Sequence, residues 1–434
     1  MDRVATHNHE AFIGLMSGTS LDGVDGALCC FHENTDGTLR IETLASASEE
    51  MPFALRSTLQ AIASANYGAL SGASEAKFDV LEQAALASNT LTELYADVVD
   101  QIKRQQPSTR ITAIGAHGQT VRHRPELGFT LQLLNGAQLA AQSEIPAICD
   151  FRSGDVALGG QGAPLVPLFH QALLSHPSQT RWILNLGGIA NLSLLPSQNA
   201  RRDCHGSTIG FDTGPASTLL DAWCQLHQGK PYDQDGAWAK TGRYDAHFLA
   251  TLLDEPFFKL DPPKSTGREL FSLQWLRAKL AAFEAQHAGL ALRPQDIQAS
   301  LVELTAASIA QSIAQSIAQP SAQPSAQPSA QSNAQLINQE ALARAQASNP
   351  IHIYACGGGV RNPFLMERLG ENLRTTLPYS ATLQSTSRLG IDPQQMEACA
   401  FAWLARERWH QKPLDYTGIT GAARAASMGA LYLP

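Results

Sequence analysis

The sequence predicts an α/β fold built from two related units. Predicted strands alternate with predicted helices, a pattern typical of α/β proteins, and we expect mainly parallel sheets. Three apolar strands lead into glycine-rich turns, at Gly14–Leu28, Gly187–Asn191 and Gly357–Gly359. The length of 434 residues favours two or three domains. Recurrence of one strand-and-turn plan therefore indicates a duplicated fold with a nucleotide held between two lobes.

The first glycine-rich turn joins two predicted strands, one containing Phe12-Ile13 and the other Ala27–Cys29. Its small residues would let backbone N–H groups approach an anion closely. Its polar residues are Ser17, Thr19, Ser20, Asp22 and Asp25. Hydroxyl groups can donate to a phosphate, and carboxylates bind Mg²⁺ beside phosphates. The turn is a candidate phosphate loop, although a simple hairpin with glycines at positive φ explains the same residues equally well.

Composition narrows the class of partner. The formal net charge of −8 argues against nucleic acid as the main partner, because phosphate backbones are bound by basic faces. The seven cysteines form no C-x-x-C pair, which favours reduced thiols in a cytoplasmic protein. No secretory signal is visible in the polar residues 1–10, and no apolar run reaches the roughly 20 residues that span a bilayer.

Between these turns, periodicity predicts the regular elements. Apolar spacing predicts a helix over 78–102. Four further elements follow in order: strand Ile111–Gly115, short strand Leu131–Leu133, helix Gly136–Ser143 and strand Ala147–Cys149. In the second half, Trp182–Leu186 and Ile351–Cys356 are predicted strands that enter the later glycine turns. A helix over Pro363–Leu373 follows the third turn, with proline at a favourable first position.

A repeat of Ser-Ile-Ala-Gln and then Pro-Ser-Ala-Gln occupies Ser308–Gln335. Its first copies keep the helical spacing of a helix that begins near Asp296. The proline copies cannot continue a helix, so we expect an uncharged surface insertion there.

Asp212 is the strongest candidate for catalysis. It lies in the tight turn Gly210–Pro215, which would expose its carboxylate at the end of a strand. There it could act as a general base for water or a hydroxyl group. The structural alternative is an aspartate that caps the next helix or forms an Asx turn, which is common.

Two further segments carry polar residues. Arg152, in a polar, glycine-dense segment, could clamp a carboxylate with two hydrogen bonds, or form a structural pair with a nearby aspartate. Asp261–Glu269 brings two cations into a rigid turn, which could be a hinge, a substrate contact or a solvated loop. His117 follows a strand and could contact substrate, although a lone histidine is more often structural.

Taken together, these motifs resemble one family, the 1,6-anhydro-N-acetylmuramic acid kinases. The matching segments occur in order over nearly the whole chain: Gly14–Leu28, Gly115–His123, Asp150–His170, Asn185–Ser193, Gly210–Asp221, Tyr232–Gly242, Pro262–Phe271, Cys356–Leu369 and Gly390–Leu404. The ordered set is specific where any single glycine turn is not. The repeat departs from the family pattern.

The resemblance implies the fold of the sugar kinase, heat-shock ATPase and actin superfamily: two ribonuclease H-like α/β lobes with a central cleft. It implies a first lobe of residues 1–150 plus 386–434 and a second lobe of residues 151–385, with a disordered insertion at about 310–335. The last predicted helix, from about Asp392 to Arg408, would pack back on the first lobe.

The resemblance also implies the reaction. Water opens the 1,6 bridge of the anhydro sugar, and ATP phosphorylates the released O6 to give N-acetylmuramic acid 6-phosphate in peptidoglycan recycling. Asp212 matches the base. ATP would be bound by Gly18, Thr19, Ser20, Leu21, Asp22, Gly23, Val24, Asp25, Gly187, Gly188, Asn191, Gly357, Gly358, Gly359 and Asn362. The sugar would be bound by His117, Arg152, Asp155, Gln161 and Glu397. Asp22 and Asp25 are the candidates for binding Mg²⁺.

The expected partners are thus ATP and a small amino sugar in the cytoplasm, with neither nucleic acid nor a membrane. Homologous kinases often form homodimers, but no interface can be identified from these residues. Another sugar or acid kinase of the superfamily is the nearest alternative. A nucleotide-driven binding protein is less favoured, because such proteins usually carry a separate client-binding domain and here the matched motifs fill most of the chain.

Overall fold

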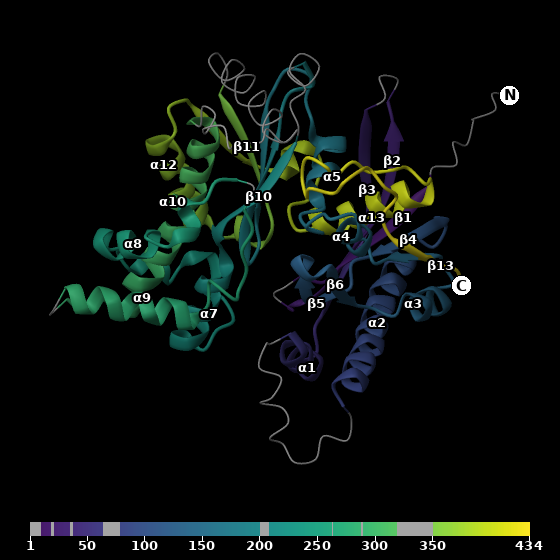
Figure 1. The fold of residues 1–434 in the computed structure, drawn as a ribbon, viewed down its shortest axis with the longest axis horizontal. Coiled ribbons are helices and arrows are strands. Elements are labelled where there is room, and N and C mark those ends of the chain that lie inside the picture. Colours follow the sequence, from purple (N-terminus) through teal and green to yellow (C-terminus); the bar gives the residue numbers. More distant parts are fainter. Residues whose placement is uncertain are drawn as a thin grey trace. The chain divides into compact units, whose positions relative to one another are not determined.

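The computed structural model describes residues 10–18, 21–34, 38–63, 79–199, 208–262, 264–287, 290–318 and 350–434. The chain divides into two compact units (Figure 1). Unit 1 comprises Met1–Leu173 and Gln395–Pro434, and unit 2 comprises Leu174–Gln394. These boundaries differ from the predicted ones, after residue 150 and before residue 386.

Residues 151–173 belong to unit 1 because their buried groups are bonded to it. The hydroxyl of Tyr416 donates to the carbonyl of Leu165, and the ring of Phe169 packs 6.1 Å from that of Trp403. This segment contains helices α4 (Ser153–Ala157) and α5 (Val166–Leu174). Nothing in its local sequence distinguishes it from a segment of the second unit.

Unit 1 is organised around a mixed six-stranded sheet. The strands are, in spatial order, β13 (Ala430–Tyr432), β7 (Ala147–Cys149), β4 (Ile111–Ala116), β1 (Ala11–Met16), β2 (Gly23–Glu33) and β3 (Leu39–Glu50). β1, β2 and β3 form an antiparallel meander, and β4 and β7 continue the sheet parallel to β1. β13 closes the edge in the antiparallel sense. A two-stranded sheet of β5 (Gln119–Arg124) and β6 (Phe129–Leu133) is separate.

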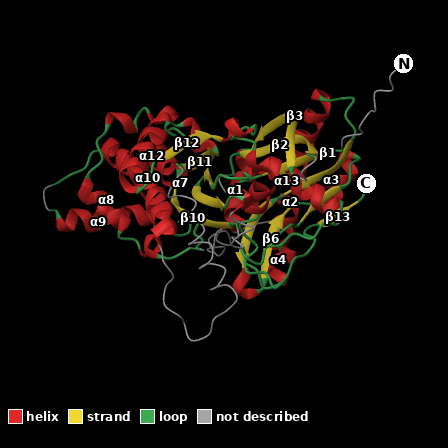
Figure 2. Ribbon diagram, turned by 90° about the horizontal axis from the view of Figure 1, so that it is seen from above, coloured by secondary structure: helices red, strands yellow, loops and turns green. Residues whose placement is uncertain are grey.

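Helices cover both faces of this sheet (Figure 2). They are α1 (Phe53–Ala63), α2 (Val80–Gln105), α3 (Gly136–Ser143) and α13 (Met396–Trp409). A side chain at Gly14 would collide with the backbone of Ala398 in α13, and one at Gly26 would collide with Val98 in α2. Glycine at these two strand positions therefore allows the helices to approach closely. The predicted last helix does pack on the first unit.

The long helix α2 begins at a capping box. Asp79 accepts from the backbone N–H of Glu82, and Glu82 accepts from that of Asp79. Together they satisfy two N–H groups that the first turn would otherwise leave unpaired. The predicted helix over 78–102 is thereby confirmed, as is the predicted helix Gly136–Ser143.

Unit 2 repeats the plan of unit 1. Its sheet has the order β10 (Ile209–Pro215), β9 (Ile189–Leu195), β8 (Arg181–Leu186), β11 (Ile351–Cys356) and β12 (Ala381–Ser385). β8, β9 and β10 form an antiparallel meander, and β11 and β12 are parallel to β8. This is the order and direction of β1, β2, β3, β4 and β7, so the α/β class and the duplication are confirmed.

The prediction of mainly parallel sheets is wrong. The two meanders contribute antiparallel pairs because their strands are joined by connections too short for a crossover helix. The glycine turns themselves show this: β1 and β2 are separated by residues 17–22, and β8 and β9 by Gly187 and Gly188.

Helices of unit 2 pack around a core that includes Trp182, Phe211 and Phe248. They are α7 (Ser217–Gln228), α8 (Ala246–Leu253), α9 (Leu273–Gln286), α10 (Pro294–Ala318) and α12 (Pro363–Thr376), with short 3₁₀ helices η3 (Gln234–Gly236), η4 (Ala239–Thr241), η5 (Pro256–Lys259), η6 (Gly358–Arg361) and η7 (Thr386–Leu389). In unit 1, η2 spans Pro125–Leu127.

The repeat begins inside α10 and not after it. Ile309, Ala310 and Ile313 are buried in the core of unit 2. The first repeat copies therefore extend the helix, as their spacing predicts, and residues 310–318 do not belong to an insertion. The rest of the predicted insertion, 319–335, lies outside the described residues.

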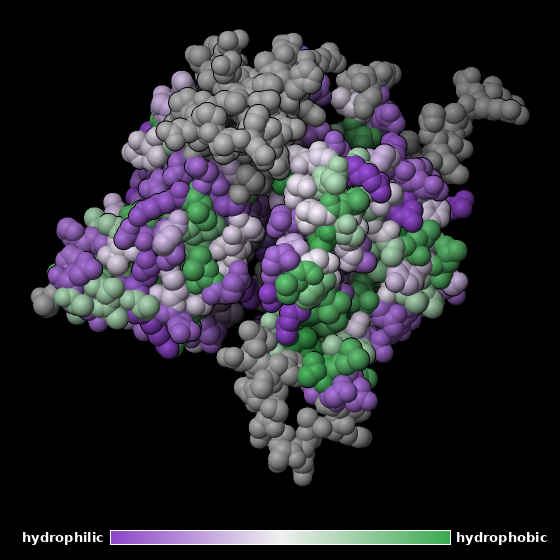
Figure 3. All heavy atoms as spheres, in the orientation of Figure 1, coloured by the Kyte–Doolittle hydropathy of each residue, from purple (hydrophilic) through white to green (hydrophobic). Residues whose placement is uncertain are grey.

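On the face shown in Figure 3, hydrophilic and hydrophobic residues are interspersed on each unit. Exposed apolar side chains include Phe53 of α1 and Phe129 and Leu131 of β6. In the part of the chain that the structure describes, no helix is both long and apolar enough to cross a membrane.

Candidate active site

In unit 2, three polar side chains lie in a row across neighbouring strands. Asp212 of β10 pairs with Asn191 of β9, which pairs in turn with Asn185 of β8. Side chains of directly paired residues project from the same face of a sheet. All three are half-buried, whereas most of their neighbours in these strands are buried and apolar. The row thus places a carboxylate and two amides beside the turn Gly187-Gly188.

A β-bulge in β10 sets the direction of the Asp212 side chain. The register of β10 against β9 shifts between Asp212 and Gly214, so Thr213 is an extra residue in β10. Thr213 turns its hydroxyl to the carbonyl of Ala190 at 3.2 Å. Bulges redirect side chains at the ends of strands, often next to active sites.

The bonds of Asp212 reject both structural alternatives for this residue. Its Oδ2 accepts from the hydroxyl of Ser265 and from the backbone N–H of Thr266, each at 2.9 Å. These donors are more than 50 residues away in the chain, so Asp212 forms no Asx turn. The N-cap of α7 is Ala216, so Asp212 does not cap the following helix.

The environment of Asp212 suits a base. Burial raises the pKa of its carboxyl to about 6, with a smaller push in the same direction from Glu269. The hydrogen bonds from Thr266 and Ser265 favour the charged form and oppose this rise. A carboxylate with a pKa near 6 is ionised at pH 7 and is a stronger base than an ordinary aspartate.

The third glycine turn packs directly on the second. A side chain at Gly357 would lie 2.5 Å from Oδ1 of Asn185, and one at Gly359 would lie 2.7 Å from Leu186. Gly357 also has a φ of 85°, which glycine adopts without strain. Asn362 then caps α12 by accepting from the backbone N–H of Leu365. The structure therefore brings the predicted nucleotide residues of unit 2 together at the ends of β8 and β11.

In unit 1, the first glycine turn is hydrogen-bonded at both ends to other segments of the unit. The hydroxyl of Ser17 donates to Gln119 at 2.7 Å, and the carbonyl of Asp22 accepts from Met51. Leu21 is buried with a φ of 57°, a left-handed conformation that is unusual for leucine. Strain of this kind at a turn is typical of functional sites. Two predicted ATP ligands, Thr19 and Ser20, lie outside the described residues.

The two candidate metal ligands have different surroundings. Asp22 is exposed, 3.9 Å from the guanidinium of Arg56. Asp25 accepts a hydrogen bond of 2.7 Å from Ser48 on β3. Gly18, Gly23 and Val24 complete the predicted first loop, and Gly23 would collide with Glu49 if it carried a side chain.

Arg152 is held by His117 and not by an aspartate. Its Nε donates to Nε2 of His117 at 3.0 Å, and its Nη1 donates to the carbonyl of Gly162 at 2.7 Å. Its Nη2 donates to no residue among those described. Burial lowers the pKa of this guanidinium, and Tyr416, Glu397 in the first turn of α13 and Asp155 oppose that shift. The structural pair between Arg152 and a nearby aspartate is therefore absent here.

Asp155 organises the loop that follows Arg152. It is fully buried, and its two oxygens accept from the backbone of Gly162 and from the hydroxyl of Thr420. Both oxygens are thus engaged inside unit 1. The side chain of Gln161 is exposed, while its N–H donates to the carbonyl of Thr420.

Comparison with known proteins identifies the family. A family model described as anhydro-N-acetylmuramic acid kinase matches residues 10–324 and 329–434. A protein of that name from Bordetella pertussis is 47% identical over 425 residues, covering 97% of this chain and 95% of the relative. Another from Psychrobacter cryohalolentis is 40% identical over 430 residues, covering 96% and 93%. The chain belongs to the anhydro-N-acetylmuramic acid kinase family.

As a member of this kinase family, the chain is a phosphotransferase that uses ATP. Solved structures that match include an activator of the 2-hydroxyisocaproyl-CoA dehydratase from Clostridium difficile with bound ADPNP. It is 10% identical, with a TM-score of 0.39, and covers 93% of this chain and 97% of its own. A putative N-acetylmannosamine kinase from Listeria monocytogenes is 11% identical, with a TM-score of 0.35 and coverage of 92% and 99%.

The sequence alone did not indicate several residues of this candidate site. Asn185, Ser265 and Thr266 touch the row of polar side chains or Asp212 itself. Ser265 and Thr266 lie in the segment Asp261–Glu269, whose role the sequence left open between hinge, substrate contact and solvated loop. Their local sequence gives no sign of contact with a residue so far away in the chain.

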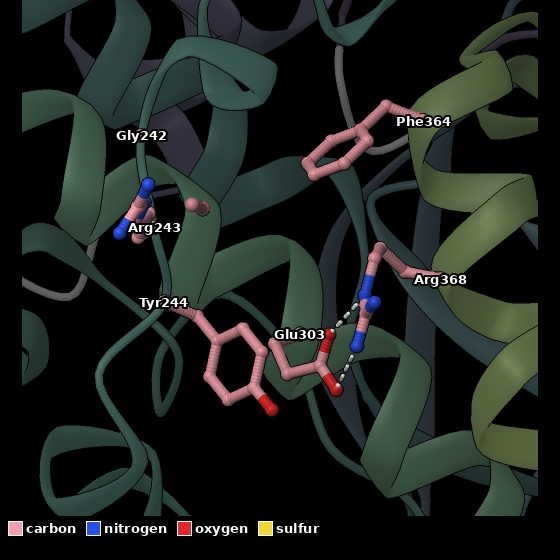
Figure 4. Close-up of a pocket in the computed structure, with 7 residues that line it drawn as sticks. Gly242, Arg243, Tyr244, Glu303, Phe364 and Arg368 are labelled. Carbon is pink, nitrogen blue, oxygen red and sulfur yellow. Dashed lines mark hydrogen bonds and ion pairs between the residues drawn. The ribbon is translucent and has the colours of Figure 1, made fainter.

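Unit 2 of this kinase also contains a hollow of about 440 Å³ (Figure 4). It lies between α10, α12 and the segment Gly242–Tyr244. Two of its charged residues already pair with each other, because Arg368 donates two hydrogen bonds to Glu303; Arg368 also lies over the ring of Tyr244. None of the predicted site residues lines it.

Proposed function

We propose that this chain opens 1,6-anhydro-N-acetylmuramic acid by hydrolysis and phosphorylates its O6, giving N-acetylmuramic acid 6-phosphate and ADP. Membership of the family supports the substrate and the use of ATP. The observation that carries the proposal is the placement of Asp212. A carboxylate with a raised pKa lies on a bulged strand, in the row of polar residues beside the glycine turn of unit 2.

A simple sugar kinase needs only a base for a hydroxyl group, whereas this reaction needs a base for water. In the proposed first step, Asp212 takes a proton from water as the water oxygen bonds to C1 of the sugar. The bond between C1 and O6 breaks, and its electron pair stays on O6. O6 then attacks the γ-phosphorus of ATP, and ADP leaves with the electron pair of the broken P–O bond. The proton on Asp212 returns to solvent.

The glycine turns supply the phosphate contacts in this proposal. Phosphoryl transfer depends mainly on positioning and on donors that match the developing charge. Gly187, Gly188 and Gly357–Gly359 expose backbone at the strand ends of unit 2, and the turn that contains Gly18 does so in unit 1. Asn191 and Asn362 flank these turns.

The residues present fit Mg²⁺. This ion is commonly bound by one or two carboxylates, with phosphate and water as its other ligands. Asp22 has an exposed carboxylate at the first turn, and Asp25 follows it on β2. The described ranges contain no cluster of three or more metal-binding side chains, which suits an ion held mainly by ATP. When bound, Mg²⁺ would neutralise charge on the transferring phosphate.

Arg152 is the proposed partner of the lactyl carboxylate of the sugar. Its Nη2 is free of described acceptors, while His117 and Gly162 fix the rest of the guanidinium. A guanidinium held in this way loses little freedom when it binds a carboxylate. Glu397 and Gln161 are the remaining candidates for sugar contacts. Because the reaction consumes ATP and serves peptidoglycan recycling, we place it in the bacterial cytoplasm.

The test is turnover in oxygen-18 water. The purified protein is incubated with ATP, Mg²⁺ and 1,6-anhydro-N-acetylmuramic acid, and the product is analysed by mass spectrometry. We expect one phosphate and one heavy oxygen on C1. Unlabelled N-acetylmuramic acid 6-phosphate, kept in the same water for the same time, corrects for exchange at the anomeric carbon.

The other outcomes separate the alternatives. Phosphate without heavy oxygen, after this correction, would mean a sugar kinase that does not hydrolyse the bridge. Absence of any phosphorylated product would reject this sugar as the acceptor and call for a screen of other sugars and acids.

A further inference from the structure

The segment Lys264–Thr266 forms hydrogen bonds with both the backbone and the side chain of Asp212. The backbone N–H of Asp212 donates to the carbonyl of Lys264 at 2.9 Å. Ser265 and Thr266 donate to the carboxylate, and both reach the same oxygen, Oδ2. Within the described chain, Oδ1 accepts no hydrogen bond. The segment therefore fixes both the main chain and one carboxylate oxygen of the proposed base.

A buried cation anchors this segment. The side chain of Lys264 is 7% exposed, and its Nζ donates to the carbonyls of Phe257 and Phe258, at 3.3 and 3.4 Å. The ammonium also lies 4.9 Å from the ring centre of Phe257. Burying a charge is costly unless its hydrogen bonds are replaced. Lys264 thus ties the segment to η5 through two hydrogen bonds from its ammonium group.

The same short helix touches the bulge. Gly214 has a φ of 145°, and a side chain there would lie 2.7 Å from the ring of Phe258. η5 therefore contacts β10 at the bulge on one side and holds Lys264 on the other. Lys264 is thus connected to Asp212 in two ways. One is through the backbone of Lys264–Thr266, and the other is through η5 and its contact with β10.

We propose that Lys264 is a positioning residue, which holds Ser265 and Thr266 on Oδ2 of Asp212 and so leaves Oδ1 as the oxygen that takes the proton from water. The inference rests on the proposed role of Asp212 as the base. An oxygen that accepts two hydrogen bonds is less basic than its free neighbour, because its lone pairs are engaged. The proton of the water therefore moves to Oδ1, while Ser265 and Thr266 keep their own.

The charged groups around Asp212 define what a titration would report. Glu269, from the loop that also carries Ser265, is the acidic group that faces it and raises its pKa. Lys264 lies in the same loop, where burial lowers the pKa of its ammonium and the charge of Asp261 opposes that shift. On β9 the residue paired with Asp212 is the neutral Asn191. A change in the bonds to Oδ2 would thus appear as a shift in the pKa of Asp212.

The first test is Ser265→Ala. It removes one hydrogen bond to the charged carboxylate and so raises the pKa of Asp212. We expect the acid limb of kcat to move up by about one pH unit, with a similar plateau at high pH. The same shift should appear in a carbon-13 titration of the carboxyl signal that Asp212→Asn removes. Such a readout does not depend on turnover.

The second test is Lys264→Met, which keeps an unbranched side chain one atom shorter and removes its donors. We expect kcat to fall about tenfold to a hundredfold, with KM for ATP and sugar changed less than twofold, because misplacing a base affects the chemical step. Lys264→Arg restores donors and should recover part of kcat. Lys259→Met is the matched control, since Lys259 is exposed and pairs only with Asp254 among the described residues.

The outcomes distinguish the inference from the function on which it rests. If Asp212→Asn keeps normal turnover, the proposed base is wrong, whatever the other variants do. If Asp212→Asn is inactive but Ser265→Ala leaves both the acid limb and the carboxyl titration unchanged, the inference alone fails. If Lys264→Met folds and keeps the wild-type kcat, Lys264 is not a positioning residue. If Lys264→Met does not fold, the kcat of Lys264→Arg tests its role, and the Ser265→Ala titration still tests the bonds to Oδ2.

Discussion

The Nε atom of Arg152 donates a hydrogen bond of 3.0 Å to Nε2 of His117. Because a guanidinium can only donate, Nε2 must be the acceptor, and the neutral imidazole carries its proton on Nδ1. Burial lowers the pKa of His117 to about 3, and the charge of Arg152 acts in the same direction. The ring therefore stays neutral at physiological pH, and its Nε2 is a fixed acceptor that orients Arg152. His117 is buried, and its Nε2 accepts this hydrogen bond from Arg152.

His117→Leu tests this orienting role. The variant removes the acceptor but keeps an apolar side chain against Phe401, whose ring centre lies 5.0 Å from that of His117. We expect KM for the anhydro sugar to rise about tenfold, the size of one lost hydrogen bond to a charged group, with KM for ATP unchanged. Steady-state kinetics measure both. His247→Leu, at an exposed position of unit 2, is the control. An unchanged KM for the sugar in folded His117→Leu would show that Arg152 does not need His117 to be oriented.

Arg152→Ala should raise KM for the anhydro sugar about tenfold to a hundredfold, because a charge-assisted contact with the lactyl carboxylate is lost. Arg152→Lys should not restore it, since an ammonium cannot replace the fork of donors. The sharpest comparison uses 1,6-anhydro-N-acetylglucosamine, which lacks the lactyl group. Turnover of that neutral sugar should be the same in Arg152→Ala and in the wild type. An equal loss of turnover on both sugars would mean that Arg152 binds another part of the substrate.

Asp212→Asn should lower kcat by about 10² to 10⁴, the usual contribution of a general base. The affinity for ATP should change little, because the amide has nearly the volume of the carboxylate. In the wild type, kcat should fall as the pH drops through about 6, because burial raises the pKa of Asp212 and the protonated form cannot accept a proton. Asp254→Asn, at an exposed site, serves as the control. An acid limb near 6 that survives in Asp212→Asn would assign it to another group.

Local signals predicted much of this site. The glycine turns after β1, β8 and β11 follow from apolar strands that end in small residues. The helix Gly136–Ser143 is predicted with the bounds that the structure gives it. Asp212 stands out because the glycines and proline around it predict a tight turn, but the structure places it within β10, half-buried beside a bulge. Each of these predictions depends on residues that are close in the chain.

Features that depend on distant contacts could not be predicted. Ser265 and Thr266 reach Asp212 only after the chain has passed through α7 and α8, and the bulge that aims Asp212 depends on pairing with β9. The role of Asp155 is another example. Its partner Thr420 lies 265 residues away, so the sequence could not show that both carboxylate oxygens are engaged.

Stability at acid pH should depend on His170, a buried residue of α5. Burial lowers its pKa to about 3, so the folded state keeps it neutral while the unfolded state protonates it below about 6.5. The unfolded state then binds more protons, and the free energy of unfolding falls as the pH drops from 6.5 towards 3. The slope is about 1.4 kcal/mol per pH unit for one histidine.

His170→Phe should remove that slope. Urea titrations between pH 4 and 6.5 should show a free energy of unfolding that depends less steeply on pH than in the wild type. His123→Phe is a useful contrast, since His123 is exposed and bonds to Thr130. An identical pH dependence in His170→Phe and the wild type would mean that His170 is protonated in the folded state.

Deletion of Pro320–Ser332 should leave kcat and both KM values within twofold of the wild type. The match to the family model is interrupted at residues 325–328, inside this stretch, so one repeat copy is not part of the family pattern. Deletion of Ser308–Gln311 is the matched comparison. It removes a repeat copy whose Ile309 and Ala310 are buried in α10, and it should prevent folding of unit 2. Loss of activity in a folded Pro320–Ser332 deletion would give the repeat a functional role.

Gly357→Ala should weaken ATP binding and lower stability together. The alanine side chain would lie 2.5 Å from Oδ1 of Asn185, and the φ of 85° is strained for any residue with a Cβ. We expect a loss of about 1–3 kcal/mol in the free energy of unfolding. We also expect at least a tenfold rise in Kd for ATP, measured by calorimetry, because the shifted turn no longer fits against Leu186.

Gly370→Ala is the matched control for this glycine. It lies within α12, where nothing approaches its missing side chain. Alanine is a better helix former, so this variant should gain about 0.5–1 kcal/mol without affecting ATP. If Gly357→Ala binds ATP as tightly as Gly370→Ala does, the third turn does not contact the nucleotide, and the ATP site of unit 2 must be built from the β8–β9 turn alone.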